Sequence, residues 1–279
     1  MQTINGSTRL IAHLGYPTEA FKAPLIYNPW FAHRGINALV VPMGVQARDY
    51  PAALQSLRRV SNWMGALVTM PHKVATLDLV DTATPTARIA GACNAILRLP
   101  DGRLLGDQFD GAGFVRGVQR KGLPLAGCGA LVVGCGGVGS AIAASLAAAG
   151  AARIALHDAD PARAGALAQR LHQHYPALRA APAGNDPAGF DLVVNGTPLG
   201  MRPDDPLPLD PQRLAPETFV GEVVMSQAHT PLLQAALARG CRVQVGTDML
   251  FEMIPAYLDF FGFGEATPEA LRAVARLEG

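Results

Sequence analysis

Short apolar runs recur along the chain, and segments with a helical spacing of apolar residues separate most of them. The runs with the length and composition of buried strands are 9–14, 38–41, 65–69, 131–133, 154–157, 192–195, 219–224 and 243–245. Strands that alternate with helices favour parallel pairing through right-handed crossovers. The pattern therefore predicts an α/β fold with doubly wound parallel sheet.

Four segments depart from this alternation. Residues 98–104 place apolar flanks around Pro100-Asp101-Gly102, a turn signal that predicts an antiparallel hairpin appended to the first sheet. Residues 198–216 are rich in proline and are expected to form a surface loop near the cofactor site. Residues 248–262 and 267–277 have helical patterns and are expected to return to the first domain.

A glycine-rich motif follows the strand at 131–133. Gly134, Gly136 and Gly139, with Gly137 and Val138 between them, form G-x-G-x-x-G at a strand-to-helix junction. In such motifs the first glycine allows a tight turn, the second a close approach to a pyrophosphate, and the third close helix packing. A helix N-terminus also offers free N–H groups to phosphates. The motif predicts dinucleotide binding, and a plain strand–helix turn is the alternative.

The motif begins in the middle of the chain, so a separate domain is expected before it. We expect a substrate-binding catalytic domain at residues 1–110 plus 247–279. The dinucleotide-binding Rossmann domain is expected at residues 111–246.

Asp158 ends the strand after the glycine motif and lies about 20 residues beyond it, where an acid binds the adenosine ribose hydroxyls of NAD. A 2′-phosphate would be repelled there by Asp158 and Asp160, and the first arginine is Arg163. Helix capping is the alternative role for both acids. For Asp160, which is followed by Pro161, we favour capping. For Asp158 we favour ribose binding.

Composition narrows the class of protein. Of the 279 residues 49% are hydrophobic and 16% charged, and the net charge is +1, which argues against nucleic acid or an anionic membrane as partner. The four cysteines show no metal spacing and are typical of reduced cytoplasmic thiols, so no metal site is expected. The chain shows no pattern of a signal peptide or a membrane-spanning segment.

Polar residues at the ends of apolar segments supply candidate chemistry. Lys73 ends VTMPHK, Asn94 lies in GACNAI, and Asp110 lies in LLGDQFDG. Singly, a lysine is usually solvated and Asp-Gly usually a turn. Together they bring a cation, an amide and a carboxylate to element ends, where open α/β sheets bind ligands. A Lys–Asp pair can accept and return the proton of a hydroxyl that is oxidised.

These motifs resemble the shikimate dehydrogenase family over almost the whole chain. The matching segments are 68–73, 91–96, 104–111, 195–201, 229–232 and 246–250. The resemblance implies that Lys73 and Asp110 act on the substrate hydroxyl and that Asn94, Gln108 and Thr69 bind the substrate. It also implies that Asn195, Thr197 and Gly246 lie at the cofactor. A role in aromatic amino acid biosynthesis and a monomeric or homodimeric state are further expectations.

The chain also departs from the family pattern. The usual Ser-x-Ser-Pro, which binds the substrate carboxylate, reads Phe21-Lys22-Ala23-Pro24 here. Lys22 is a candidate replacement anchor, and a solvated lysine is the alternative. Met225 and Met253 stand at positions where the family has Tyr and Gln, and the family's NADP-binding Asn-Arg-Thr reads Asp158-Ala159-Asp160.

The sequence thus predicts an NAD-dependent dehydrogenase that oxidises a secondary alcohol of a cyclic hydroxy-acid such as shikimate or quinate. One alternative is a dehydrogenase for a less polar or amino-substituted alcohol. Another is a ligand sensor that has kept the fold without catalysis.

Overall fold

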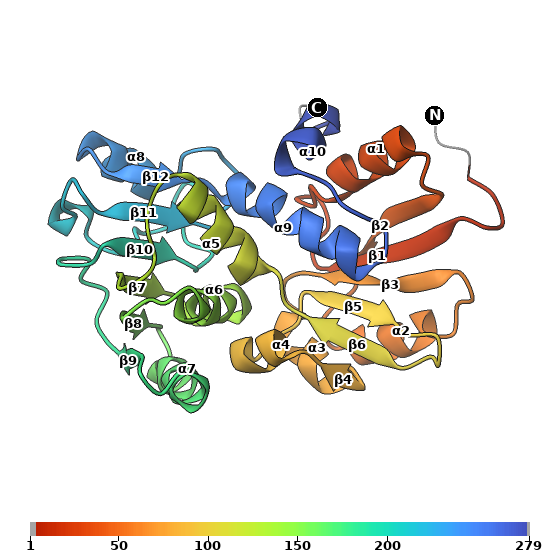
Figure 1. Ribbon diagram of the computed structural model, residues 1–279, viewed down its shortest axis with the longest axis horizontal. Helices are drawn as coiled ribbons and strands as arrows, with labels where there is room; N and C mark the ends of the chain where they lie inside the picture. Colours follow the sequence, from red (N-terminus) through yellow and green to blue (C-terminus); the bar gives the residue numbers. More distant parts are fainter. Residues whose placement is uncertain (1–3, 278–279) are drawn as a thin grey trace. The chain divides into compact units, whose positions relative to one another are not determined.

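The computed structural model describes residues 4–277, which form two compact units. Unit 1 contains the described residues up to Arg88, Ala92–Phe109, and those from Ile254 onward; unit 2 contains Ile89–Gly91 and Asp110–Met253. Each unit is built around its own six-stranded sheet (Figure 1). No helix within residues 4–277 is long and apolar enough to cross a membrane.

The elements alternate along the chain much as the apolar pattern predicts. Up to Phe109 they are β1 (Arg9–Gly15), α1 (Pro24–Arg34), β2 (Ala38–Gly44), α2 (Tyr50–Leu57), β3 (Trp63–Val68), α3 (Lys73–Leu79), β4 (Thr82–Ala83), α4 (Pro85–Ala90), β5 (Ala95–Arg98) and β6 (Leu104–Asp107). From Asp110 they are α5 (Asp110–Arg120), β7 (Gly129–Val133), α6 (Gly137–Ala148), β8 (Arg153–His157), α7 (Pro161–His174), β9 (Arg179–Pro182), β10 (Leu192–Asn195), η1 (Pro211–Arg213), β11 (Phe219–Glu222), α8 (Pro231–Ala238), β12 (Arg242–Gln244), α9 (Gly246–Phe260) and α10 (Pro268–Val274).

The sheet of unit 1 has the order β2-β1-β3-β5-β6-β4. Strands β2, β1 and β3 are parallel, whereas β3 pairs with β5 and β5 with β6 in antiparallel fashion. The hairpin predicted around residues 98–104 is confirmed, with its turn closed by a hydrogen bond from Leu99 N to Arg103 O (2.8 Å). The two-residue edge strand β4 was not predicted, because so short a segment carries no periodic signal.

The two faces of the unit 1 sheet differ in the polarity of their side chains. Ala12 and Leu14 of β1 pack into an apolar cluster with Trp63 of β3 and Leu54 of α2. Because side chains alternate along a strand, His13 faces the other side of the sheet. The apolar pattern predicts only a buried strand here, and the structure adds that the strand presents an imidazole on one face.

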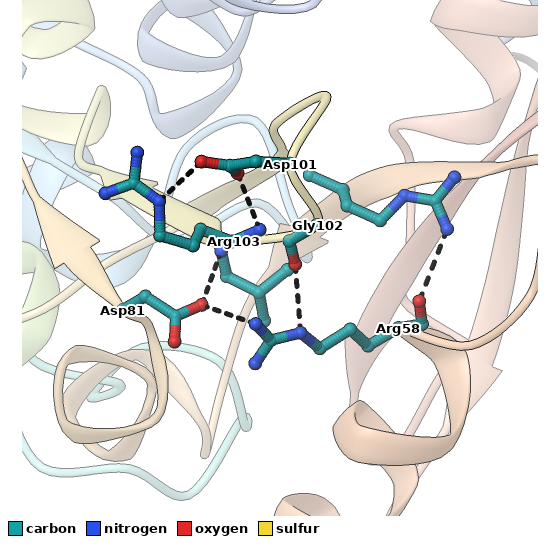
Figure 2. A network of polar contacts seen from close by, with 7 residues as sticks. Arg58, Asp81, Asp101, Gly102 and Arg103 are labelled. Carbon is teal, nitrogen blue, oxygen red and sulfur yellow. Dashed lines mark hydrogen bonds and ion pairs between the residues drawn. The ribbon is translucent and has the colours of Figure 1, made fainter.

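A polar network ties the β5–β6 hairpin to its surroundings in unit 1 (Figure 2). Arg58, just after α2, donates Nε–H to the carbonyl oxygen of Gly102 (3.0 Å) and pairs with Asp81 (2.9 Å). The same Asp81 oxygen accepts the N–H of Leu104 (2.7 Å). This network holds the start of β6 against the segment before β4.

The C-terminal helix α10 lies beside α1 in unit 1, as expected (Figure 1). Thr267 caps its first turn by accepting the N–H of Ala270, and Arg276 N donates to Leu25 O (2.9 Å). The end of the chain is thus fastened to the helix that follows the first strand.

The sheet of unit 2 is parallel throughout, with the order β12-β11-β10-β7-β8-β9. This is the doubly wound order in which the first strand, β7, lies at the centre and the chain leaves it on both sides. Ligands of such sheets bind outside the carboxyl ends of the two strands at this switch point, here β7 and β10. Strand β9 was not predicted, because its four residues, RAAP, are weakly apolar.

Candidate functional site

The glycine loop between β7 and α6 has the geometry that its sequence predicts. Gly134 has φ +94°, and a Cβ there would lie 2.7 Å from Thr197 Cγ2. A Cβ on Gly139 would overlap the carbonyl oxygen of Gly134, so the helix lies directly on the turn. A Cβ on Gly136 would meet nothing within 4 Å. The first and third glycines are thus required for packing, and the second leaves open space in which a pyrophosphate fits.

The first turn of α6 offers backbone donors beside that space. Its N-cap is Gly136, which has no side chain to accept hydrogen bonds from the turn. Free N–H groups at a helix start attract phosphate oxygens. Cys135 is buried, burial raises the pKa of its thiol to about 12, and its carbonyl accepts the hydroxyl of Ser140 (3.0 Å). The cysteine is therefore a packing residue of the loop.

The carboxylate of Asp158 joins the end of β8 to this loop. One oxygen accepts the N–H of Cys135 (2.7 Å) and the other accepts the N–H of Asp160 (2.9 Å). Asp158 is only half-buried, so its carboxylate also faces solvent beside the glycine loop. Asp160 caps α7 by accepting the N–H of Ala162 (3.0 Å), which confirms its predicted capping role.

The second loop at the switch point is shaped by a buried network. Asn195, fully buried at the end of β10, accepts the N–H and the hydroxyl of Thr197 (3.1 and 2.6 Å). Its amide donates to Leu199 O (3.0 Å) and to Glu222 (3.5 Å). Glu222 also accepts the hydroxyl of Thr230 (2.9 Å), and burial raises the pKa of its carboxyl. Asn195 therefore shapes the loop that presents Thr197; the part played by Glu222 was missed from sequence.

Gly246 begins α9 at a place where no larger residue fits. A Cβ there would overlap the carbonyl oxygen of Val224, which follows β11. The glycine thus lets the backbone of α9 start directly against the neighbouring strand of the sheet. Whether it also contacts a cofactor stays a prediction.

The polar candidates of unit 1 gather where β1 and β3 end. Thr69 N donates to Leu14 O (2.9 Å), which holds the segment after β3 against β1. Lys73 is the first residue of α3, and its carbonyl accepts the N–H of Cys93 (2.8 Å). The residue after Cys93 is Asn94, so this hydrogen bond brings the main chain of Lys73 close to the segment that carries Asn94.

The side chain of Asn94 is buried and only partly satisfied. Its Oδ1 accepts the N–H of Phe109 (2.9 Å), and its main-chain carbonyl accepts Val68 N (2.7 Å) and the hydroxyl of Tyr257 (2.9 Å). Its Nδ2 has no hydrogen-bond partner within residues 4–277. An unpaired buried donor costs free energy that a substrate hydroxyl would recover. Sequence reasoning missed Tyr257, because its contact joins residues far apart in the chain.

Gln108 and Asp110 lie on either side of the boundary between the units. Gln108, in unit 1, is buried, and its backbone N–H donates to Asp107 (2.7 Å). Asp110 is also buried and is the first residue of α5 in unit 2. A Cβ on the next residue, Gly111, would overlap the carbonyl oxygen of Ala141, so α5 begins in direct contact with α6. Lys22 is half-buried in the loop before α1.

His13 is a further polar residue of this region that the sequence did not single out. Burial, and secondly the charge of Lys73, lower its pKa to about 3. The imidazole is therefore neutral, and the positive charge of Lys73 contributes to this. Within the described chain, no group of three or more His, Cys, Asp or Glu side chains forms an arrangement that could hold a metal ion.

The doubly wound sheet and its glycine loop define a protein of the Rossmann dinucleotide-binding class. Residues 14–96 match the family described as the shikimate dehydrogenase substrate binding domain. The chain is 36% identical over 277 residues to a protein of Acidiphilium cryptum named shikimate dehydrogenase (NADP(+)), with 98% of each covered. The chain belongs to the shikimate dehydrogenase family.

Two solved structures resemble it over nearly the whole length. One is a quinate dehydrogenase from Corynebacterium glutamicum in complex with NAD (28% identity, TM-score 0.83, covering 96% of this chain and 98% of that one). The other is a ligand-free 5-ketofructose reductase of Gluconobacter sp. strain CHM43 (27% identity, TM-score 0.84, covering 96% and 97%). Similar proteins thus include oxidoreductases named for different substrates.

Proposed function

We propose that this protein catalyses the NAD-dependent interconversion of a secondary alcohol and a ketone on a shikimate- or quinate-like cyclic substrate. The observation that carries the proposal is the link between Lys73 and Asn94. A backbone hydrogen bond from Cys93 to Lys73 brings the main chain of Lys73 close to the start of Asn94, and Asn94 Nδ2 is a buried donor without a protein partner in the described chain.

The proposal assigns substrate binding and catalysis to residues 1–110 with 247–279, and dinucleotide binding to residues 111–246. The compact units differ slightly from these domains, because Asp110 and residues 247–253 belong to unit 2. The open space at Gly136 and the free donors of α6 fit a pyrophosphate. A bound nicotinamide ring would supply the acceptor for the hydride that leaves the carbon bearing the hydroxyl.

The choice of NAD rests on Asp158. Its carboxylate lies beside the glycine loop, where it can accept the ribose hydroxyls and would repel a 2′-phosphate. The next residue is Ala159, so the chain has no arginine there to pair with a phosphate. The curated relative from Acidiphilium cryptum is named for NADP(+), and the quinate dehydrogenase structure contains NAD.

Each polar candidate has a role in the proposed chemistry. Lys73 accepts the proton of the hydroxyl as the carbon is oxidised and returns it in the reverse direction. Asp110 acts on the same hydroxyl and supports the ammonium form of the lysine. Asn94, Thr69 and Gln108 hold the remaining substrate hydroxyls.

Absorbance at 340 nm tests the proposal directly. We expect formation of the reduced cofactor when NAD is mixed with enzyme and either shikimate or quinate, and a far lower rate with NADP. If neither compound reduces NAD or NADP at millimolar concentration, the proposed function is wrong.

A further inference from the structure

An aromatic stack stands where the resemblance places paired serine hydroxyls. The ring of Phe21 lies against the imidazole of His13, with ring centres 4.1 Å apart and planes 28° from parallel. The second serine position holds Ala23, which is buried. Two hydroxyl donors are therefore replaced by an aromatic face and a methyl group.

This stack lies at the same strand ends as the proposed substrate residues. A Cβ on Gly15, the last residue of β1, would approach Phe21 Cζ (2.7 Å) and the carbonyl oxygen of Met70 (2.8 Å), and would overlap the methyl group of Thr69. Phe21 and Thr69 thus converge on one point.

The stacked rings of His13 and Phe21 form one wall of this region, and one ring nitrogen of His13 in it has no hydrogen-bond partner in the described chain. The residue is 8% exposed, and its Nδ1 is buried without a hydrogen-bond partner in the part of the chain that the structure describes. A neutral imidazole exchanges a hydrogen bond with a hydroxyl and offers no positive charge. A carboxylate against this face would lose its hydration without gaining charged or hydroxyl donors from it, which is costly.

We propose that His13 and Phe21 are specificity-determining residues and that their wall receives an uncharged, hydrogen-bonding end of the substrate instead of a carboxylate. This inference rests on the proposed function, because it concerns the substrate of the same site. It names the chemical class of substrate: a cyclic polyol or ketone without a charged group at this end.

A matched pair of compounds separates charge from shape. Shikimate and its methyl ester share the ring and all hydroxyls, and differ in the negative charge. We expect the wild-type protein to show at least a tenfold higher kcat/KM for the methyl ester, and to bind it more tightly by calorimetry. The double variant Phe21→Ser/Ala23→Ser restores both hydroxyls and should shift the preference toward shikimate by at least tenfold.

The role of His13 is tested on the same pair. His13→Leu should lower kcat/KM for the methyl ester at least tenfold and leave the KM for NAD within twofold, whereas His13→Asn, which keeps a hydrogen-bonding group, should retain more of the activity. His33→Asn, on the exposed side of α1, is the control and should change neither value. Equal losses in His13→Leu and His33→Asn would contradict the assignment.

The outcomes distinguish this inference from the proposed function. Preference of the wild-type protein for shikimate would overturn the inference and leave the function standing; a loss of that preference in Lys22→Met would then identify Lys22 as the carboxylate anchor. Turnover of neither compound, nor of quinate, with NAD or NADP would refute the function. Calorimetry then decides the inference alone: tighter binding of the ester supports it, and tighter binding of shikimate, or binding of neither, overturns it.

Discussion

The carboxylate of Asp158 accepts the backbone N–H of Cys135 at 2.7 Å and thereby joins the end of β8 to the glycine loop. A strand-end acid has two tasks here. It holds the loop in the conformation that leaves space at Gly136, and in the proposed function it is also the acceptor that would favour ribose hydroxyls over a 2′-phosphate. A change at Asp158 therefore tests the loop geometry and the proposed cofactor preference together.

Asp158→Asn should raise the KM for NAD about tenfold with little change in kcat. An asparagine accepts with one oxygen only, so its NH₂ group would face one of the two N–H donors, and a hydrogen bond to a charged group contributes about 1.5–3 kcal/mol. Steady-state kinetics with NAD and NADP measure the change. Asp160→Asn is the control, because asparagine caps a helix as well as aspartate does. A wild-type preference for NADP would contradict the role of Asp158.

Lys73→Met should lower kcat about 1,000-fold and leave the Kd for NAD within twofold, because loss of a proton-transfer group costs about 10²–10⁴ in rate. The pKa of His13 should also rise from about 3, since the charge of Lys73 helps to lower it. Stopped-flow kinetics, cofactor titration and histidine NMR measure these effects. Lys121→Met serves as the control: Lys121 pairs with Asp248 (2.7 Å) in unit 2, so kcat should be unchanged.

Glu222→Gln should change how stability depends on pH. Burial raises the pKa of the folded Glu222 carboxyl above its ordinary value of 4.5, so its favourable contribution is complete below pH 4.5 and is lost as the pH rises through the folded pKa. The variant has no charge to bury. Its Tm relative to wild type should therefore increase between about pH 4 and pH 7. Glu217→Gln, at an exposed position, is the control, and its Tm relative to wild type should not change between these pH values. If the Tm of Glu222→Gln relative to wild type also does not change with pH, the prediction is wrong.

Asp81→Ala should lower the free energy of unfolding by about 1 kcal/mol, because it removes the acceptor of Leu104 N–H and a half-exposed ion pair with Arg58 (Figure 2). Urea denaturation measures the loss. Asp101→Ala removes an exposed ion pair with Arg103 and the acceptor of the exposed Arg103 N–H, and should lower the denaturation midpoint less than Asp81→Ala does. Equal effects of the two substitutions would mean that the network does not support the hairpin.

Sequence patterns predicted those elements whose conformation depends on a few consecutive residues. The glycine loop follows from the spacing of Gly134, Gly136 and Gly139, because Gly139 meets the backbone of Gly134 in the same turn and Gly136 meets open space. The contact of Gly134 with Thr197, in the loop after β10, is not local and came only from the structure. Capping by Asp160 and the hairpin of β5 and β6 depend on a few consecutive residues, and both were predicted. The short edge strands β4 and β9 were missed, because their pairing depends on neighbouring strands and not on their own apolar residues.

The sequence by itself determined the fold class, the dinucleotide loop and the positions of Lys73 and Asn94. These features depend on the strand, turn and helix preferences of residues that are neighbours in the chain. Only the tertiary structure decided which of these distant groups contact one another. The stacking of His13 on Phe21, the hydrogen bond of Tyr257 to Asn94 and the bond of Asp158 to Cys135 each join segments that are separated along the chain. Contacts of this kind arise from the packing of strands and helices, and no local pattern encodes them.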